Sequence, residues 1–376
     1  MRVVFAEAIR LLERQEPFVL ATVVATSGSC PQRPGAKILV RQDGSLVGTV
    51  GGGCVEGDVW YLAKELLRNH GNQPLYREYV LNEAMMMRDG LICGGTMYLF
   101  IEPVLPGTDG QLAAMAREIC QTYDGGTQVA LASVTKPGLN AVRLGAKLLI
   151  RQDRTTCGTL GSEVLETMAI AALDRLTQEQ GTCYLKAPDG SELFVENFSK
   201  TPLLILLGGG HIGKALAQIG LLLGFCVYVV DERPEFASRE RFPEAAAAVV
   251  DDFANWPAKI PLSDNTFVVV ATRGHKFDDI ALETALRIKP RYVGLLGSRR
   301  KSAMIYQSLH QKGFSIEEIR QVHTPVGLNI GAISPEEIAV SIMAEIVMCR
   351  RGGTGAPMTD DRLLEQLTTE FAPKSS

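Results

Sequence analysis

The sequence predicts an α/β protein of two domains, with a doubly wound parallel sheet following an α+β domain built from two repeated hairpin-helix units. Three observations predict this fold. A strand, a glycine turn, a helix and a second strand follow one another from residue 203. Further short apolar runs continue this alternation, and one stretch of the N-terminal half recurs 110 residues later. We expect domains at 1–195 and 196–376, because a chain of 376 residues can bury more than one core.

The glycine turn is the most informative motif of the second domain. Leu203–Leu207 has no polar residue, which suits a parallel strand buried on both faces. It is followed by the G-x-G-x-x-G of Gly208, Gly210 and Gly213, with His211 between the last two. The first glycine permits a tight turn, the second lets a pyrophosphate approach, and the third lets the helix pack closely on the strand. The helix N-terminus would attract that anion, so all four residues are candidate cofactor contacts.

An acid ends the second strand. Asp231 stands where a carboxylate can bond a ribose 2′-hydroxyl. Arg233 and Arg239 follow it and could instead take a 2′-phosphate, so NAD and NADP both stay open. These features predict a Rossmann-like nucleotide-binding domain, although a fold does not fix its ligand.

Two later loops carry further candidate ligands. Apolar runs at 246–250, 266–271 and 292–296 predict more parallel strands, and ligands bind at the carboxyl ends of such strands. The candidate contacts in the loops that follow are Arg273, His275, Ser298 and Arg299. Positively charged residues at the start of a helix favour the binding of a phosphate group. In a hydride-transferring enzyme, His275 would move protons with Asp278 or Arg273.

An internal repeat organises the first domain. Gly35–Asp43 matches Gly145–Asp153, and Gly48–Gly51 matches Gly158–Gly161. We expect two copies, at about residues 18–69 and 128–176, that pair to close a shared core.

The copies differ at one turn. Gly51, Gly52, Gly53 and Cys54 of the first copy correspond to Gly161, Ser162, Glu163 and Val164 of the second. A glycine triplet that opens a helix can cradle an anion, whereas a glutamate there would repel a phosphate. The first copy is therefore the predicted ligand site and the second a scaffold. The alternative is that the triplet only makes a tight turn.

Composition limits the function classes. The net charge of −4 gives no electrostatic footprint for nucleic acid or an anionic membrane. The eight cysteines include no C-x-x-C pair, which weighs against a structural zinc site. The first residues mix acids, bases and apolar residues, unlike a signal peptide, so we expect a cytoplasmic protein. A homodimer is expected only from the frequency of such assemblies.

The motifs taken in order resemble one family. They are G-S-C-P-x-x-P-G-A-K, G-T-V-G-G-G-C-V-E, C-G-G-x-x-x-L-x-I-E-P, L-G-G-G-H-I-G, V-V-D-E-R-P-E-F, T-R-G-H-x-x-D, G-L-L-G-S-R-R-K and G-L-x-I-G-A-x-S-P-E-E-I-A-x-S-I-x-A-E-I. This set is similar to the XdhC/CoxI family of accessory proteins for molybdenum hydroxylases such as xanthine dehydrogenase. The resemblance implies a chaperone that binds the molybdenum cofactor and protects it while a sulfur-donating desulfurase exchanges an oxo ligand for a sulfido ligand. The chaperone would then deliver the cofactor to the apo-hydroxylase.

Two thiols suit that task. Cys54, at a predicted helix N-terminus, would be favoured as a thiolate and could contact molybdenum. Cys93, beside Gly94, is the second candidate for contact with the metal. The alternative for either is an inert buried thiol.

Two other functions stay open at this level. One is an NAD(P)-dependent oxidoreductase that uses the second domain, and the other is a nucleotide-sensing regulatory protein. We expect an accessory factor rather than an enzyme. Family members are often labelled xanthine dehydrogenases, yet this chain has none of the iron–sulfur cysteine spacings of a hydroxylase.

Overall fold

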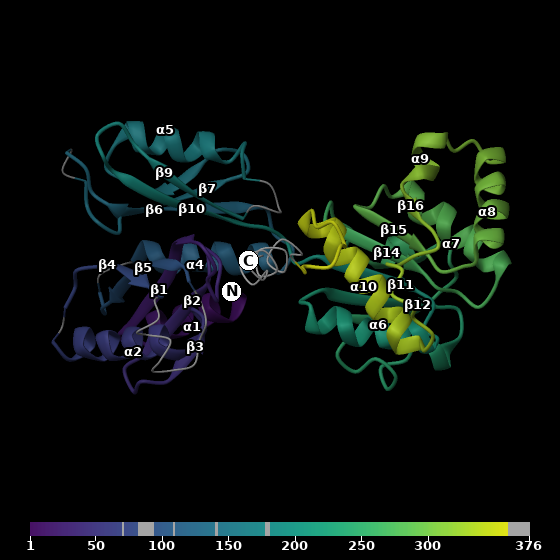
Figure 1. The fold of residues 1–376 in the computed structure, drawn as a ribbon, viewed down its shortest axis with the longest axis horizontal. Coiled ribbons are helices and arrows are strands. Elements are labelled where there is room, and N and C mark those ends of the chain that lie inside the picture. Colours follow the sequence, from purple (N-terminus) through teal and green to yellow (C-terminus); the bar gives the residue numbers. More distant parts are fainter. Residues whose placement is uncertain (70, 82–93, 108–109, 140–141, 177–180, 360–376) are drawn as a thin grey trace, which may run out of the picture. The chain divides into compact units, whose positions relative to one another are not determined.

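The chain forms two compact units. The computed structural model describes residues 1–69, 71–81, 94–107, 110–139, 142–176 and 181–359, and it divides the chain into Met1–Thr201 and Pro202–Ser376 (Figure 1). The boundary expected between residues 195 and 196 falls inside strand β10 (Glu192–Phe198), which pairs with strands of the first unit. The division therefore comes a few residues later than the sequence suggested.

The first unit contains the same set of elements twice. The first copy comprises α1 (Arg2–Glu13), β1 (Phe18–Ser27), β2 (Lys37–Arg41), β3 (Leu46–Gly48), α2 (Gly53–Arg68), β4 (Leu75–Val80) and β5 (Thr96–Val104). The second comprises α4 (Gly110–Tyr123), β6 (Val129–Lys136), β7 (Lys147–Arg151), β8 (Thr156–Gly158), α5 (Glu163–Ala172), β9 (Thr182–Lys186) and β10. The sheets run β3-β2-β1-β5-β4 and β8-β7-β6-β10-β9, so their strand orders are equivalent. The repeat is thus longer than the expected 18–69 and 128–176.

Each sheet of the first unit is covered on both faces. Helix α2 packs on one face of the first sheet and α5 on one face of the second, on the outer sides in Figure 1. Helices α1 and α4 pack against the opposite faces. Strand β1 shows why its sequence is apolar almost throughout. Val19 and Ala21 contact the α2 side, and Phe18 and Leu20 contact the α1 side.

The second unit is the predicted doubly wound sheet. Its strands are β11 (Leu203–Leu207), β12 (Cys226–Asp231), β13 (Ala247–Val250), β14 (Thr266–Val270), β15 (Tyr292–Leu295) and β16 (Val322–His323). Its helices are α6 (His211–Leu222), α7 (His275–Arg287), α8 (Arg299–Gln311), α9 (Ile316–Arg320) and α10 (Pro335–Arg351), with 3-10 turns η1 (Pro234–Phe236) and η2 (Trp256–Lys259). The order β13-β12-β11-β14-β15-β16, with every pair parallel, confirms the fold class.

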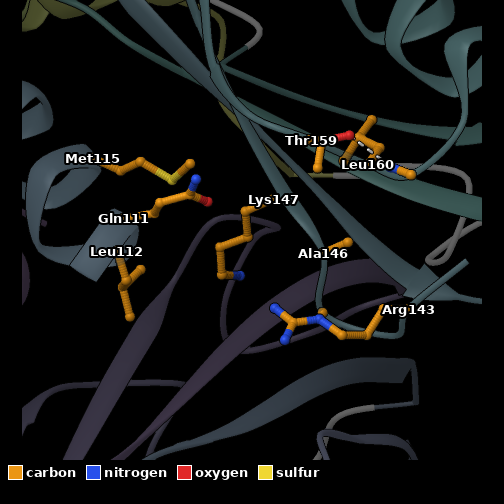
Figure 2. Close-up of a pocket in the computed structure, with 10 residues that line it drawn as sticks. Gln111, Leu112, Met115, Arg143, Ala146, Lys147, Thr159 and Leu160 are labelled. Atoms are coloured by element: carbon orange, nitrogen blue, oxygen red, sulfur yellow. Dashed lines mark hydrogen bonds between the residues drawn. The ribbon is translucent and has the colours of Figure 1, made fainter. Parts of the chain in front are cut away.

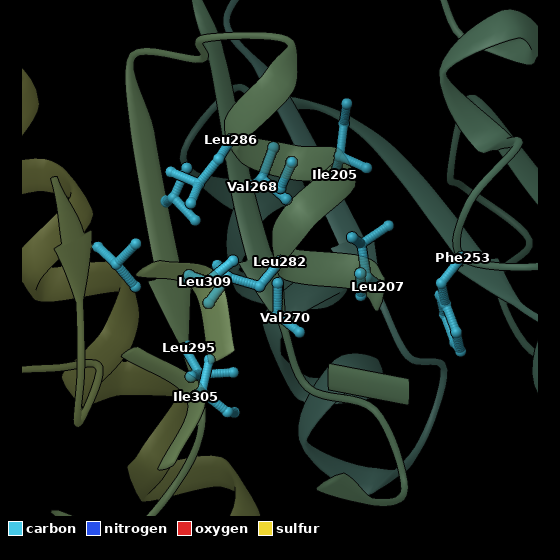
Figure 3. Close-up of a cluster of buried hydrophobic side chains, with 14 of the residues drawn as sticks. Ile205, Leu207, Phe253, Val268, Val270, Leu282, Leu286, Leu295, Ile305 and Leu309 are labelled. Atoms are coloured by element: carbon cyan, nitrogen blue, oxygen red, sulfur yellow. The ribbon is translucent and has the colours of Figure 1, made fainter. Parts of the chain in front are cut away.

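Two hydrophobic cores cover this sheet. Ile205 and Leu207 of β11 pack with α7 and α8 residues such as Leu282 and Ile305 (Figure 3). The alternate residues Leu204 and Leu206 pack against α6 and α10 on the other face. The unbroken apolar run of β11 is therefore explained by burial on both faces.

The strand order reverses between β11 and β14, where ligands of such folds bind. Within the described part of the chain, no helix is long and apolar enough to cross a membrane.

Candidate functional site

Segments far apart in the first copy meet beside Cys30. The Cys30 thiol donates to the carbonyl oxygens of Ser27 at 3.4 Å and of Thr96, at the start of β5, at 3.3 Å. A methyl group added to Gly95 would lie 2.6 Å from Cys30 Sγ, and one added to Gly28 would lie 3.3 Å from the Gly94 carbonyl oxygen. The loop of the G-S-C-P motif is thus packed against Gly94 and Gly95.

The same loop also contacts the glycine turn that precedes α2. A methyl group added to Gly51 would lie 2.8 Å from Pro31 Cγ, one residue after Cys30. Cys54 lies in the first turn of α2 and is partly exposed. The structure therefore brings together three of the motifs named from the sequence, around Cys30, around Gly51–Cys54 and at Gly94–Gly95. Cys93 lies outside the described residues.

A glutamate of the chain occupies part of the glycine turn. Glu56 accepts hydrogen bonds from the Thr49 hydroxyl and from the Val50 N–H at 3.0 Å. Burial alone would raise the pKa of Glu56, but the Thr49 hydroxyl and the N–H groups of Gly52, Val50 and Gly51 outweigh it and lower that pKa. An external anion therefore cannot use these N–H groups without displacing Glu56.

The space before α2 remains open. A methyl group added to Gly52 would meet no heavy atom within 4 Å, and Gly52 provides no side-chain cap for the helix. The φ angles of Gly51, Gly52 and Gly53 are +125°, +71° and +64°, a backbone path that L side chains rarely adopt. The positive end of the α2 dipole faces this space, which suits a negatively charged group.

The second copy tests whether the triplet is needed only to make the turn. Glu166 accepts hydrogen bonds from the Thr159 hydroxyl at 2.6 Å and from the Leu160 N–H at 3.0 Å. Glu56 accepts from Thr49 and Val50 in the same way. Yet the residue before α5 is Ser162, with a φ of −152°. The turn closes in both copies around the same glutamate, so the second and third glycines of the first copy are not required for closure.

The second copy has a pocket of its own. It has a volume of about 180 Å³ and lies beside β7, the start of α4 and the turn at Thr159–Gly161 (Figure 2). Arg143 and Lys147 line it, but the Lys147 ammonium is paired with Glu102 at 2.6 Å. Without an open glycine triplet and without a thiol equivalent to Cys54, this pocket lacks the features that mark the first copy.

The glycine turn of the second unit has the predicted geometry. Gly208 has a φ of +124°, and a methyl group added to it would collide with the Ala271 carbonyl. A methyl group added to Gly213 would collide with the Gly208 carbonyl. Those two glycines allow the turn and the close packing of α6 on β11. The position of Gly210 is open, with no heavy atom within 4 Å of an added methyl group, and His211 is exposed at the first position of α6.

Asp231 is engaged by the chain itself. Its Oδ2 accepts from Gly209 N–H at 2.9 Å and Arg233 Nη2 at 3.0 Å, and its Oδ1 accepts from Arg233 N–H at 3.1 Å and Nε at 2.9 Å. Burial would raise the pKa of Asp231, but these donors lower it. A carboxylate has about four acceptor positions. A ribose hydroxyl would have to displace one of these protein donors.

The two later loops meet at a buried acid. Asp278 is fully buried, accepts from the Thr272 hydroxyl at 2.7 Å and forms an ion pair with Lys301. Lys301 comes from the G-S-R-R-K loop, so the pair joins the start of α7 to the start of α8. Asp278, expected to assist His275, instead holds these two loops together.

The other predicted contacts of these loops are placed as follows. Arg273 pairs with Glu232, which follows β12, and the Ser298 side chain caps α8 by accepting from Lys301 N–H. The side chains of His275 and Arg299 are outside the described residues. Among the described residues, no group of three histidine, cysteine, aspartate or glutamate side chains could hold a metal ion.

Sequence reasoning did not single out Cys30 as a site residue. The sequence shows only a cysteine between serine and proline, and its neighbour Gly95 is 65 positions away along the chain. The available signal was its place in a glycine- and proline-rich loop next to the repeat, which a fold is needed to interpret.

Known families match both units. A model of the XdhC and CoxI family matches residues 11–79 and 123–186, one segment in each copy, and a model of the XdhC Rossmann domain matches residues 204–346. The chain belongs to the XdhC and CoxI family. The resemblance drawn from the motifs is thereby confirmed.

Several relatives in this family carry informative names. The chain is 27% identical over 342 residues to a Bacillus subtilis protein named as a probable xanthine dehydrogenase subunit, and the match covers 91% of this chain and 96% of that protein. It is 24% identical over 359 residues to the molybdenum cofactor insertion chaperone PaoD of Escherichia coli, and the match covers 93% of this chain and 88% of PaoD.

Two further comparisons concern length and fold. The chain is 27% identical to the uncharacterized protein YqeB of Escherichia coli. The match covers 94% of this chain but only 48% of the length of YqeB. A crystal structure of a protein named a xanthine dehydrogenase, from Bacillus halodurans, is similar with a TM-score of 0.70 and 26% identity, covering 95% of this chain and 99% of that one.

Proposed function

We propose that this protein binds the molybdenum cofactor in its first unit and inserts it into a xanthine dehydrogenase-type hydroxylase. The observation that carries the proposal is the meeting of the Cys30 loop, the Gly51–Cys54 turn and Gly94–Gly95 in the first copy. Family membership supports it, because PaoD, named as a molybdenum cofactor insertion chaperone, is similar over most of both chains.

The chemistry of the first copy fits this cofactor. Molybdopterin has a phosphate and an anionic dithiolene–metal head group, and the open space at Gly52 lies before a helix N-terminus that favours negative charge. Cys54 provides a thiol, a ligand type that soft metal centres accept, in the first turn of that helix. When bound, the cofactor would supply the redox metal, and the chain would hold it and shield it from solvent.

The finer steps are part of the same proposal. While the cofactor is held, a desulfurase partner would supply sulfur for the exchange of one oxo ligand, and the apo-hydroxylase would then receive the sulfurated form. The protein would act in the cytoplasm, with no turnover of its own.

The second unit gives no independent support for NAD(P)-dependent oxidation. Asp231, the expected ribose ligand, is saturated by Gly209 and Arg233. Asp278, the expected partner of His275, is buried against Lys301 and Thr272. We therefore propose no reaction for this unit.

The deciding experiment measures molybdenum and pterin in the purified protein. The protein would be isolated anaerobically from a host that makes the cofactor, with molybdenum measured by elemental analysis and pterin by fluorescence after oxidation. We expect nearly one of each per chain. Gly52→Asp would place a carboxylate in the open space and also strain the backbone at its φ of +71°, and Cys54→Val would install the residue of the second copy. Both should lower the molybdenum content at least about tenfold.

Matched changes in the second copy provide the control. Ser162→Asp adds the same charge at the equivalent position before α5 and should leave the molybdenum content unchanged. Thermal unfolding of each variant separates loss of cofactor from loss of fold. Absence of molybdenum and pterin from the wild-type protein, or equal losses in Gly52→Asp and Ser162→Asp, would refute the proposed site. Activation of an apo-hydroxylase by the loaded protein then tests insertion.

A further inference from the structure

A second cavity lies in the other unit, beside the glycine turn. It has a volume of about 160 Å³ and is bounded by one face of α6 and by the segment that leads into β13. Its apolar walls come from Ala217, Leu221, Phe242 and Pro243. Two cations, Lys214 and Arg241, also line it.

Arg241 is held in place but not neutralised. Its Nε donates to the Gly209 carbonyl oxygen at 2.8 Å, and its guanidinium lies 5.2 Å from the Phe236 ring centre and 5.8 Å from that of Phe242. Its Nη2 is buried and has no hydrogen-bond acceptor among the described residues. A buried donor without an acceptor is costly and rare in folded proteins, so Arg241, which lines the cavity, keeps an unsatisfied N–H.

The neighbouring arginines differ from Arg241 in this respect. Arg233 forms its bidentate pair with Asp231, and Arg239 donates to the Ala245 carbonyl oxygen at 2.5 Å. The sequence pattern suggested these two residues as phosphate ligands. Arg241 has no carboxylate partner in the described part of the chain, so its charge is available.

Lys214 supplies the second charge. It lies in the first turn of α6, its side chain is exposed, and no described acidic group pairs with it. Glu244 is the acid among the residues that line the cavity, and its side chain is exposed to solvent. The cavity thus combines an apolar wall with one exposed carboxylate and two cations for which no ion pair is found among the described residues.

We propose that this cavity binds a phosphate monoester that has one small aromatic or aliphatic group. A phosphate monoester has a charge near −2 at neutral pH, which is opposite to the charges of Lys214 and Arg241, and a guanidinium N–H that the chain does not engage can donate to one of its oxygens. The volume is close to that of an engineered cavity of about 150 Å³ that holds benzene, so a single ring fits against Leu221 and Phe242. This site is independent of the proposed cofactor site in the first unit.

The test uses phenyl phosphate as the probe and the full-length protein. Isothermal titration calorimetry at low salt should show saturable binding to one site, weakened by added sodium chloride. Lys214→Gln should weaken binding about fivefold, as expected for an exposed charge. Arg241→Gln should weaken it about tenfold or more, because it removes charge-assisted hydrogen bonds. Arg239→Gln is the matched control and should bind as the wild type does.

Further probes decide the ligand class. Phenol should bind more weakly because it has no phosphate, and inorganic phosphate should bind more weakly because it has no ring. Lys214→Gln, at an exposed position, keeps the test valid if Arg241→Gln unfolds, which thermal unfolding would reveal. Absence of saturable binding, or equal affinity of wild type and Lys214→Gln, would overturn the proposed site. Equal affinity for phenyl phosphate and inorganic phosphate would overturn the assigned ligand class.

Discussion

Lys37 of the first copy forms its ion pair with Glu196 of the second copy, with 2.5 Å between Nζ and Oε2. The reciprocal pair joins Lys147 of the second copy to Glu102 of the first at 2.6 Å. The Lys37 and Glu196 side chains are 4% and 8% exposed. Each ammonium also lies about 6 Å from a phenylalanine ring of the other copy, Lys37 at 5.8 Å from Phe194 and Lys147 at 5.9 Å from Phe100. The two copies are therefore joined by crossed polar contacts as well as by apolar packing.

Breaking one crossed pair should destabilise the first unit. Lys37→Met would leave the Glu196 carboxylate buried without its cation, which we expect to cost about 3–5 kcal/mol of unfolding free energy. The measurement is urea unfolding followed by Trp60 fluorescence in a Trp256→Phe background, so that the signal comes from the first unit alone.

The double variant is the control for that experiment. Lys37→Met with Glu196→Leu removes both charges and should regain most of the lost stability, because apolar residues often replace a buried ion pair at little cost. If the double variant were as unstable as Lys37→Met, lost packing rather than an unpaired charge would be the cause.

The two turn glutamates should have equal structural effects and different functional ones. Glu56→Ala and Glu166→Ala each remove the acceptor for a threonine hydroxyl and a backbone N–H, and each should cost about 1–3 kcal/mol. Only Glu56→Ala should also raise the molybdenum content, because it frees the N–H groups that Glu56 occupies beside the open glycine triplet and removes a negative charge there. Equal molybdenum content in the two variants would argue against a role for this turn.

The pair between Asp278 and Lys301 should stabilise the second unit. Lys301→Met would leave a fully buried carboxylate without its cation, with an expected loss of about 3–5 kcal/mol measured by Trp256 fluorescence in a Trp60→Phe background. Adding Asp278→Asn removes the charge and should recover part of the loss. An unchanged midpoint for Lys301→Met would show that the pair contributes little.

Glu7 should contribute to acid unfolding. Hydrogen bonds from Arg10, opposed by burial and reinforced by Arg41, lower the pKa of Glu7 from 4.5 to about 2. Because the folded-state pKa is depressed, its stabilisation is complete above about pH 4.5 and is lost as the pH falls toward 2. Glu7→Gln should reduce the pH dependence of unfolding in this window. Glu13→Gln, an exposed change on the same helix, should leave it intact.

The local sequence predicted the elements of the second unit well. The apolar run of β11 and the spacing of Gly208, Gly210 and Gly213 depend on neighbours within a few residues, so their consequences are visible in the sequence. The role of Asp231 was harder to predict. Whether its carboxylate faces a ligand or the donors of Gly209 and Arg233 depends on how two loops pack, which spacing does not reveal.

The candidate sites depended more strongly on the fold. The contact of Cys30 with Gly95 and of Pro31 with Gly51 arises because β1 pairs with β5 and β2 lies beside β1. Arg241 became a candidate only because its segment returns to the glycine turn at Gly209. No periodicity in the sequence reports such contacts between distant segments.

By itself the sequence determined the fold class, the family, the glycine turns and the presence of a repeat, because each is encoded by residue type at short or constant spacing. The tertiary structure alone decided how far the repeat extends and which charges pair across it. Strands β5 and β10 share the pattern Leu-Phe-Ile/Val-Glu at residues 99–102 and 193–196, and they hold the same place in their sheets. The offset between these two segments is 94 rather than 110 (193 − 99), so a comparison at constant spacing does not reveal the match. Lys37 and Glu196 are 159 residues apart, and only the packing of one sheet on the other brings them together.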